Sequence, residues 1–467
     1  MTEEKVANEI QLAVRSTGFL TYSEERKLLR RVDLRLMPLL ILLYLCKNLD
    51  VNNISYVTTM NKGTHHNVLT ELKMTKDDWS WTSTIYFIPF VIFEIPSTIM
   101  MKKSTPKVHL FRIAFLWGAV TACQAAVKNK AGLYALRFLL GAAEAGMYPG
   151  MLSLLCFWYR PDEITTRMAF LGVLGSFSNI LTAFITYGFS FASGRGGLSG
   201  WQWVFLIEGI FTVLCSFLIL FYLPNYPDSA INWLEEEEKA YLLARLPPQA
   251  PKSTDANLSL PDIKKALQLS TTWAFSFLKL FQSLGTYGLA FWLPSIIQDS
   301  SSTNCTSSKA YFPPGYLVFA SLVVSLISFI ILTTVQLKPV LYAFIIIATL
   351  SSAADGSVLS SWMTHTLEGS SQIGFAFAFS NSLAQLGGII GPQIFRARYA
   401  PRYTVPYAVC LTFIGLAMII VTFIWLKTKN VTYKLMRERR QRLKERSVDP
   451  NEKPVYNHEV SELTEFK

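Results

Sequence analysis

The chain has 467 residues, of which 51% are hydrophobic and only 16% are charged. Soluble domains carry roughly 25% charged residues, so this composition excludes an ordinary soluble protein and indicates a polytopic membrane protein. The formal net charge of +11 lies in the ends and short loops, as orientation by the positive-inside rule requires. Nucleic-acid binding is therefore a poor explanation of the positive charge.

The cysteines and histidines give no sign of catalytic or metal chemistry. The six cysteines lie far apart with no CxxC pair, and the five histidines lie in predicted loops or tails. We interpret the cysteines as packing residues, and no HExxH or histidine-box site is available. We expect no cofactor and no metal, and a membrane enzyme is the weakest of the functions considered.

The first half of the chain contains six predicted spans of about 20 apolar residues, the length that a bilayer crossing needs. They follow a polar N-terminal tail (1–32) that should stay in the cytosol. In chain order they are 37–57, a span ending near 101, 108–127, 133–157, 168–191 and 203–222. Residues 33–223 are thus predicted to form a first six-helix bundle.

A polar linker, predicted to be cytosolic, divides the chain at 224–272 and contains the acidic run Glu235 to Glu238, interpreted as a solvated helix face. The second bundle, 273–426, has predicted spans at 273–297, 316–335, 340–363, 373–395 and 403–426. The remaining tail, 427–467, is strongly basic and should also be cytosolic, where anionic lipid is its simplest partner.

The eleven predicted spans conflict with the charge rule. An odd number of crossings from a cytosolic N-terminus places the basic C-terminal tail outside, against the positive-inside rule. Either one segment does not cross as drawn, or one span is missing. The irregularity is expected at one of two places: the short gap Gln336 to Pro339, or the abrupt passage from YFPPGY into the next apolar run.

The fourth span contains the stretch RFLLGAAEAGMYP, in which Arg137 and Glu144 are seven residues apart. Seven residues are two helical turns, so both charges share a face, and glycines on that face allow a neighbouring backbone to approach. A charge at this depth costs at least roughly 2.5 to 3.5 kcal/mol on insertion scales. Two interpretations remain open, a buried ion pair that locks helices together and a proton and anion site.

The first span offers a second charge pair, Lys47 and Asp50, three residues apart on one face. They lie near the outer end of the span, so an interfacial position explains them equally well.

Several motifs resemble the fungal allantoate permease family, a group of anion:cation symporters in the major facilitator superfamily. The fourth span matches that family's R-x3-G-x2-E-x-G-x2-P pattern through Arg137, Gly141, Glu144, Gly146 and Pro149. The first span is similar to its D-x-R-x-x-P and LD-x-x-NI patterns, and LPNYPDSAINWLEEEE and LGGIIGPQIFRARYAPRY are similar to the segments after its sixth span and around its eleventh. The resemblance covers Asp33 to Trp425.

The resemblance implies an all-α integral membrane protein, a major facilitator-type two-bundle transporter with eleven recognisable spans where twelve are expected. It implies import of a small organic anion, a vitamin or carboxylate such as allantoate, nicotinate or pantothenate, together with protons. Alternating access about a central site would carry the anion across. The plasma membrane and a monomeric state are the expected setting.

The site residues follow from the same resemblance and from the charges. Arg137 is predicted to bind the substrate carboxylate bidentately, with Lys47 in second place. Glu144 is predicted to carry the proton, because desolvation favours a neutral carboxyl, and its protonation would release Arg137; Asp50 is the second candidate. The resemblance also implies that the cavity is lined by Gln282, Tyr287, Asn381 and Gln385, of which half are equally explained as interhelical hydrogen bonds.

Two departures from the family pattern matter. Val51 stands where many members have an arginine or lysine, so Lys47 is the expected substitute. After PPGY the family continues into an eighth span that has no counterpart in this sequence, a difference of about one span's worth of residues. A non-transporting nutrient sensor or an inactive truncated transporter is therefore the alternative function.

Overall fold

The computed structural model describes residues 20–227, 229, 233–246, 260–297, 314–335, 369–394 and 404–448, and between 340 and 367 only residues 340, 343–344, 347–348, 351, 358–360, 362–364 and 366–367. All regular structure in these residues is helical, which confirms the predicted all-α class. In chain order the helices are α2 (Tyr22–Tyr56), α3 (Val68–Glu71), α4 (Lys76–Lys103), α5 (Pro106–Cys123), α6 (Lys130–Glu144), α7 (Met147–Trp158), α8 (Pro161–Ser190), α9 (Gly200–Tyr222), α10 (Glu236–Ala244), α11 (Leu260–Gln268), α12 (Ser270–Ile297), α13 (Pro314–Thr334), α15 (Gly369–Ile394) and α16 (Thr404–Val448), with 3-10 turns at Gln124–Ala126 and Arg195–Gly197.

Local sequence explains where several helices begin. Thr21 and Glu24 form a capping box before α2, and Thr75 and Asp78 form another before α4. In each box the side chains satisfy backbone N–H groups that the first helical turn leaves unpaired. The helices α2 and α16 extend beyond the predicted spans, so the predicted domain boundaries at 32 and 426 fall inside continuous helices.

Eight helical segments in the described residues are long and apolar enough to cross a membrane. They correspond to the predicted second to sixth spans and to those at 316–335, 373–395 and 403–426. The predicted spans 37–57 and 273–297 are helical within α2 and α12 but are not among the eight. The one remaining predicted span, 340–363, is described only in part. The full count of eleven spans therefore stays a prediction.

The outer surface of α8 shows how the bundle meets its surroundings. Large apolar side chains along this helix are exposed at Phe170, Val173, Phe177, Ile180 and Phe184. Their spacing of three or four residues places them on one face. An exposed apolar stripe of this size marks a surface that contacts another protein or lipid. In a membrane-spanning bundle it is the pattern of a lipid-facing helix.

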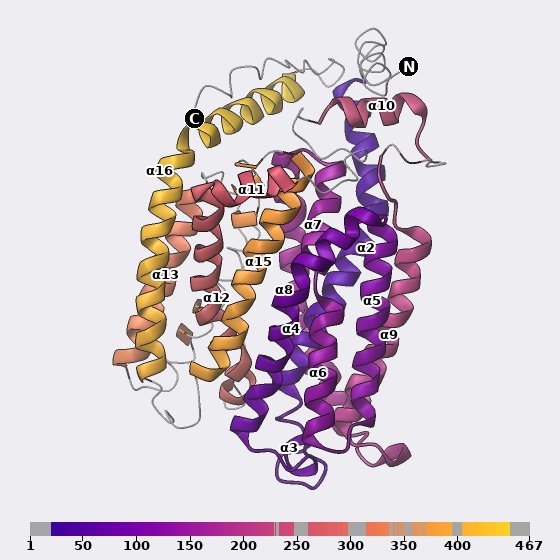
Figure 1. The fold of residues 1–467 in the computed structure, drawn as a ribbon, viewed down its shortest axis with the longest axis vertical. Coiled ribbons are helices and arrows are strands. Elements are labelled where there is room, and N and C mark those ends of the chain that lie inside the picture. Colours follow the sequence, from indigo (N-terminus) through magenta and orange to yellow (C-terminus); the bar gives the residue numbers. More distant parts are fainter. Residues whose placement is uncertain are drawn as a thin grey trace.

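The helices form two groups that stand side by side (Figure 1). Helices α4 and α15 belong to different groups and run antiparallel in contact with one another. Near one end of the pair Gln393 Nε2 donates to Thr84 Oγ1 at 2.9 Å, and farther along Ser382 Oγ donates to Glu94 Oε2 at 2.8 Å. The two halves therefore meet through polar contacts as well as apolar packing.

Helix α2 begins and α16 ends at the same end of the bundle, where α10 and α11 also lie (Figure 1). We call this the linker end. Helix α15 starts at the linker end, and α16 runs back to it (Figure 1).

The directions of α12 and α13 locate the irregularity in the span count. Trp273 packs on Phe379 of α15, and Tyr287 bonds to Gln385, which lies farther along α15, so α12 runs parallel to α15 and away from the linker end. Tyr316 packs on Trp425 and Phe329 packs on Tyr407, so α13 runs antiparallel to α16 and also starts at the linker end. Two consecutive helices thus run in the same direction, and the residues between them, 298–313, lie outside the described part of the chain. Of the two suspected places, this arrangement favours the passage around YFPPGY over Gln336 to Pro339.

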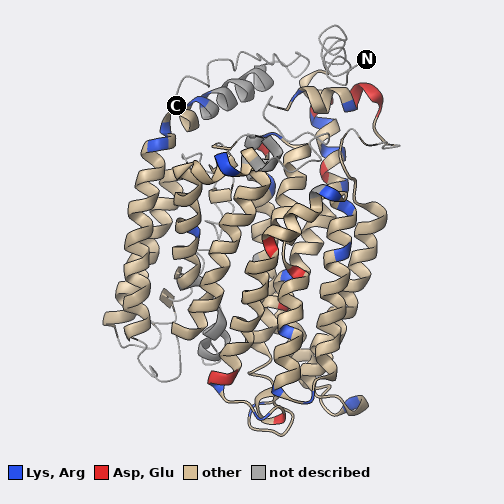
Figure 2. Cartoon of the chain, in the orientation of Figure 1, with Lys and Arg blue, Asp and Glu red and all other residues tan. Residues whose placement is uncertain are grey.

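Many charged residues lie at the linker end (Figure 2), and several of them form ion pairs. Arg245, just after α10, is buried and bonds to Glu25 of α2 at 3.0 Å and to Glu163 of α8. Nearby, Arg167 holds Asp33 through two hydrogen bonds of 2.8 and 3.0 Å. The contacts of Arg245 fasten the linker to the first half, and those of Arg167 join α8 to α2. We call Arg245, Glu25 and Glu163 the linker-end cluster.

Candidate functional site

The predicted fourth span is two helices instead of one. Helix α6 ends at Glu144, and α7 begins at Met147 after Gly146, whose φ of 88° lies in the left-handed region. Glycine adopts this conformation without the steric penalty that other residues meet. The break leaves the Glu144 carboxyl at the negative end of the α6 dipole, where an ionised carboxylate is disfavoured.

The close approach predicted for the glycines of this stretch is confirmed at Gly141. A Cβ atom on Gly141 would lie 1.9 Å from the backbone oxygen of Tyr86 on α4. Only a glycine leaves room for this contact, so Gly141 brings α6 against α4 between the two charged positions.

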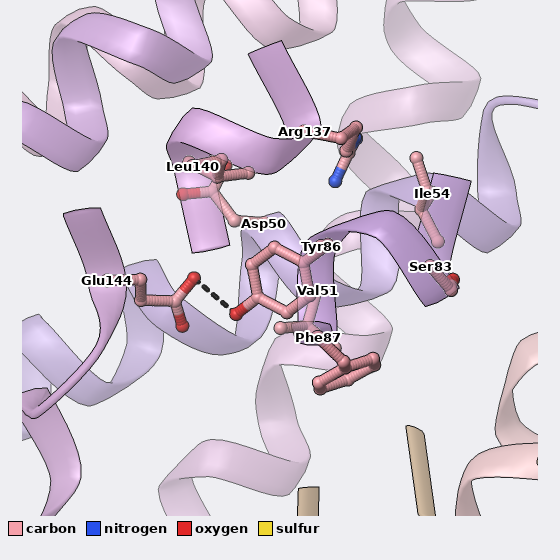
Figure 3. A pocket seen from close by; sticks show the side chains of 9 residues that line it. All are labelled: Asp50, Val51, Ile54, Ser83, Tyr86, Phe87, Arg137, Leu140 and Glu144. Carbon is pink, nitrogen blue, oxygen red and sulfur yellow. Dashed lines mark hydrogen bonds between the residues drawn. The ribbon is translucent and has the colours of Figure 1, made fainter. Parts of the chain in front are cut away.

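A small cavity lies beside this contact, between α2, α4 and α6. It is lined by Asp50, Val51, Ile54, Ser83, Tyr86, Phe87, Arg137, Leu140 and Glu144 (Figure 3). It offers about 30 Å³ of space to the centres of water molecules. One water needs roughly 10–15 Å³ by this measure, so the cavity has room for about two waters and is too small for an organic anion.

Arg137 is buried at the wall of this cavity, with 4% of its surface exposed. Its Nε and Nη2 atoms have no hydrogen-bond partner, and its guanidinium lies 5.4 Å from the centre of the Phe205 ring. No carboxylate oxygen of the described residues forms an ion pair with Arg137. The contact between Arg137 and Glu144, on which the predicted release step depended, is therefore absent in this conformation.

Glu144 has a different partner, which sequence reasoning missed. Tyr86 donates its hydroxyl to Glu144 Oε2 at 2.6 Å, while Oε1 is buried with no hydrogen-bond partner (Figure 3). Nothing in the spacing of Tyr86 distinguishes it from other aromatic residues of α4, because it meets Glu144 only through the packing of α4 on α6. The two carboxyl oxygens thus differ in environment: Oε2 accepts a hydrogen bond, and Oε1 is buried without one.

The second predicted pair is split. Asp50 is buried and accepts a hydrogen bond from Trp117 Nε1, and it lines the cavity. Lys47 is half-buried, and its ammonium interacts electrostatically with Glu144 and Glu94 instead of pairing with Asp50. The side chain of Asp50 therefore lies inside the helix bundle, and its depth in the bilayer stays a prediction.

Three of the four residues predicted in the second half, Tyr287, Gln385 and Asn381, form hydrogen bonds. Tyr287 donates to Gln385 Oε1 at 2.5 Å, and its ring packs on Phe87 of α4 at 5.0 Å between centroids. Asn381 donates to Glu94 of α4, in the other half. Gln282 is half-buried on α12. None of the four lines the cavity beside Arg137, which is formed by the first half alone.

A sequence comparison decides the family. The sequence pattern described as Major Facilitator Superfamily matches residues 40–321, more than half of the chain. The chain belongs to the Major Facilitator Superfamily. It is accordingly a multi-pass membrane protein and a secondary transporter, not an enzyme.

Relatives within the superfamily cover much of the chain at modest identity. The MFS transporter prlL of a fungal species (strain NRRL 50135) is 28% identical over 401 residues, which cover 81% of this chain and 81% of that protein. A protein of Agrobacterium vitis, provisionally named a tartrate transporter, is 30% identical over 300 residues, covering 64% of this chain and 66% of that protein.

Solved structures of the superfamily share the fold. The crystal structure of the human organic anion transporter MFSD10 superimposes with a TM-score of 0.56 at 14% identity, covering 83% of this chain and 99% of that one. The major facilitator-type fold predicted from the sequence is thereby confirmed.

Proposed function

We propose that this transporter imports a small organic anion together with a proton, as a member of the allantoate permease group. The observation that carries the proposal is Arg137: a buried guanidinium in the middle of the first half, with unpartnered nitrogen atoms and a cavity beside it. In this proposal residues 33–223 and 273–426 are the two moving bundles, 224–272 is the linker between them, and the plasma membrane is the setting.

The free atoms of Arg137 suit a carboxylate. Nε and Nη2 form one edge of the planar guanidinium, and two parallel N–H···O bonds from such an edge hold a carboxylate in a fixed orientation. An unpaired cation in the membrane interior is costly, so an incoming anion would gain most where this charge lies. The tartrate assignment of one relative supports an organic acid as the class of cargo.

Glu144 is proposed as the proton carrier, with Asp50 in second place. Its position at the end of α6 and its burial both favour the neutral carboxyl. The unpartnered Oε1 is the atom that can take up the proton, while Tyr86 holds Oε2. Because Arg137 and Glu144 line the same cavity, an anion on Arg137 and a proton on Glu144 can balance each other's charge without a direct contact between the two residues.

The small volume of the cavity implies that the anion enters in another conformation. About 30 Å³ admits water but not an organic acid. Alternating access requires that one half rock against the other. Such a movement would separate Phe87, which lines the cavity, from the ring of Tyr287 in the second half, and so open the space beside Arg137. Lys47, Tyr287 and Gln385, which lie near this interface, are the proposed further contacts of the anion.

The directions of α12 and α13 support a second candidate, a transporter-like sensor that does not transport. Consecutive helices that start at the same end leave the second half one described crossing short of the arrangement expected for the family. A binding site in the first half could persist in such a protein without transport.

The test is uptake of a panel of labelled organic acids by cells that express the full chain, measured with an inward proton gradient and again after an uncoupler. We expect gradient-dependent accumulation of at least one acid. Arg137→Ala should lower uptake at least tenfold by removing the anion contact, and Glu144→Gln should abolish accumulation while leaving exchange of internal for external acid. Arg137→Lys is the matched control: it keeps the charge but loses the bidentate edge, so partial activity is expected.

Unchanged gradient dependence in Glu144→Gln would remove the proton role of Glu144. Absence of uptake of every acid by protein located at the cell surface, combined with retained binding of an acid, would favour the sensor.

A further inference from the structure

Glu94 of α4 is a fully buried carboxylate whose two oxygen atoms are both bound by the other half of the protein. Asn381 Nδ2 donates to Oε1, and Ser382 Oγ donates to Oε2 at 2.8 Å, both from α15. Two donors on adjacent residues that each bind one oxygen describe a small carboxylate-binding site on α15. In this conformation its occupant is the side chain of Glu94.

A buried cation of the second half completes this site. Lys279 of α12 is 8% exposed, its Nζ lies 3.3 Å from Ser360 Oγ, and the carboxyl group that acts on it electrostatically is Glu94. Glu94 and Lys279 each lie nine residues from the linker end of their helices, about 13 Å at 1.5 Å per residue. The two charges therefore share a depth, on opposite halves.

The contact is not an ordinary ion pair. No described cation lies within 4 Å of Glu94, so its carboxylate depends on two neutral donors and on the more distant ammonium groups of Lys279 and Lys47. A contact serving only to join two helices would need no ionisable group, and an ionised one at this depth costs at least roughly 2.5 to 3.5 kcal/mol. The site is thus built to hold a carboxylate, whichever molecule supplies it.

Movement of the halves changes the occupant. Alternating access separates the first half from the second, and Glu94 then leaves Asn381, Ser382 and Lys279 without their carboxylate. Buried donors and a buried ammonium without a partner are costly. A second carboxylate that enters at this moment would restore every contact and the charge balance.

We propose that Asn381, Ser382 and Lys279 form a second carboxylate-binding subsite, which Glu94 occupies in the present conformation and a carboxylate of the cargo occupies when the halves part. Resting on the proposed function, this inference assigns the cargo to the dicarboxylic acids, with one carboxylate on Arg137 and the other on the second half. Glu94 and the cargo compete for the same three residues.

The experiment compares binding of matched acids to the purified full chain in lipid nanodiscs by isothermal titration calorimetry. The probes are the straight-chain dicarboxylates from malonate to adipate, each beside the monocarboxylate of equal length. We expect at least one dicarboxylate to bind the unmodified chain tenfold or more tightly than its monocarboxylate partner.

Three variants locate the effect. Lys279→Met should bring the dicarboxylate preference below about threefold while monocarboxylate binding persists, and Lys279→Arg should retain most of it. Glu94→Gln should strengthen dicarboxylate binding, because the internal competitor loses its charge. Glu208→Gln is the matched control, since this buried carboxylate of α9 is bound by Asn53 within the same half and should leave the preference unchanged.

The outcomes separate the two proposals. Equal binding of both acid classes that Arg137→Ala abolishes would overturn the second subsite and leave the proposed function intact. An unchanged preference in Lys279→Met and in Glu94→Gln would also overturn the subsite. Failure of every acid to bind the unmodified chain would overturn both.

Discussion

The buried arginine of the linker-end cluster and the buried arginine of the central cavity differ in their ion-pair partners. Arg245 is buried and bonds to two carboxylates, Glu25 and Glu163. Arg137 is also buried, yet two of its nitrogen atoms have no hydrogen-bond partner, and its guanidinium lies 5.4 Å from the centre of the Phe205 ring. One arginine has its counterions within the chain, and the other has a cavity in front of it.

This difference distinguishes a structural charge from a binding charge. A buried pair with good geometry is balanced within the protein, so removing one member leaves the other uncompensated. A buried charge without a partner lowers stability, and its presence is explained only by something that binds it. The free-energy cost of burying the Arg137 guanidinium can thus be offset by a ligand that binds it.

The sharpest test of the comparison is the pair Arg245→Met and Arg137→Met. Arg245→Met strands two carboxylates and should cost about 3–5 kcal/mol, the usual effect of breaking a buried pair. Arg137→Met removes a charge that forms no ion pair with the described residues and is acted on only electrostatically by Asp50 and Glu144. It should therefore cost less stability than Arg245→Met, while anion binding is lost. Thermal unfolding of the purified variants, followed by intrinsic fluorescence, measures both.

A triple variant provides the control for Arg245. Replacing Glu25 and Glu163 by Gln in the Arg245→Met background removes the stranded charges and should recover part of the lost stability. Equal destabilisation by Arg245→Met and Arg137→Met would refute the distinction drawn between the two arginines.

A smaller effect is expected from Gly141→Ala, which tests how the cavity wall is built. The added Cβ would meet the Tyr86 backbone oxygen, so α6 and α4 must separate, at about 1–3 kcal/mol for overpacking of this kind. Anion uptake should fall because Arg137, Tyr86 and Glu144 change their relative positions. Unfolding temperature and uptake of the same variant report the two effects.

Gly188→Ala in α8 is the matched control, since a Cβ there meets nothing within 4 Å. In a helix alanine is favoured over glycine by roughly 0.5–1 kcal/mol, so this variant should be as stable as the parent or slightly more so. A loss of stability at Gly188 equal to that at Gly141 would show that glycine loss itself, not the close approach, is harmful.

The smallest effect is expected at an exposed pair away from both regions. Lys130 and Asp78 lie 3.5 Å apart, and 54% of the lysine side chain is exposed. Solvent-screened pairs contribute about 0–1 kcal/mol, so Lys130→Ala should change stability by less than the other variants and leave uptake unaltered. A shift in unfolding temperature as large as that of Arg245→Met would contradict this ranking.

Sequence alone determined the features that depend on the spacing of nearby residues along the chain. Runs of apolar residues predicted the helical membrane class, and the spacing of Arg137, Gly141 and Glu144 predicted that two charges and a close-approach glycine share one side of a helix. These follow from helix periodicity and from the length of a bilayer crossing. The parity of the charge rule also exposed an irregularity in the second half, near one of two places.

Tertiary structure decided which groups meet. Periodicity states which face a side chain is on but not what lies opposite, so Tyr86 as the partner of Glu144 and Glu94 as the partner of Asn381 could not be predicted. The close approach of Ser97 to Gly146, where an added Cβ would meet its Oγ at 2.4 Å, likewise could not be predicted. Partners distant in sequence are chosen by the packing of whole helices, and only the folded chain brings them within bonding distance.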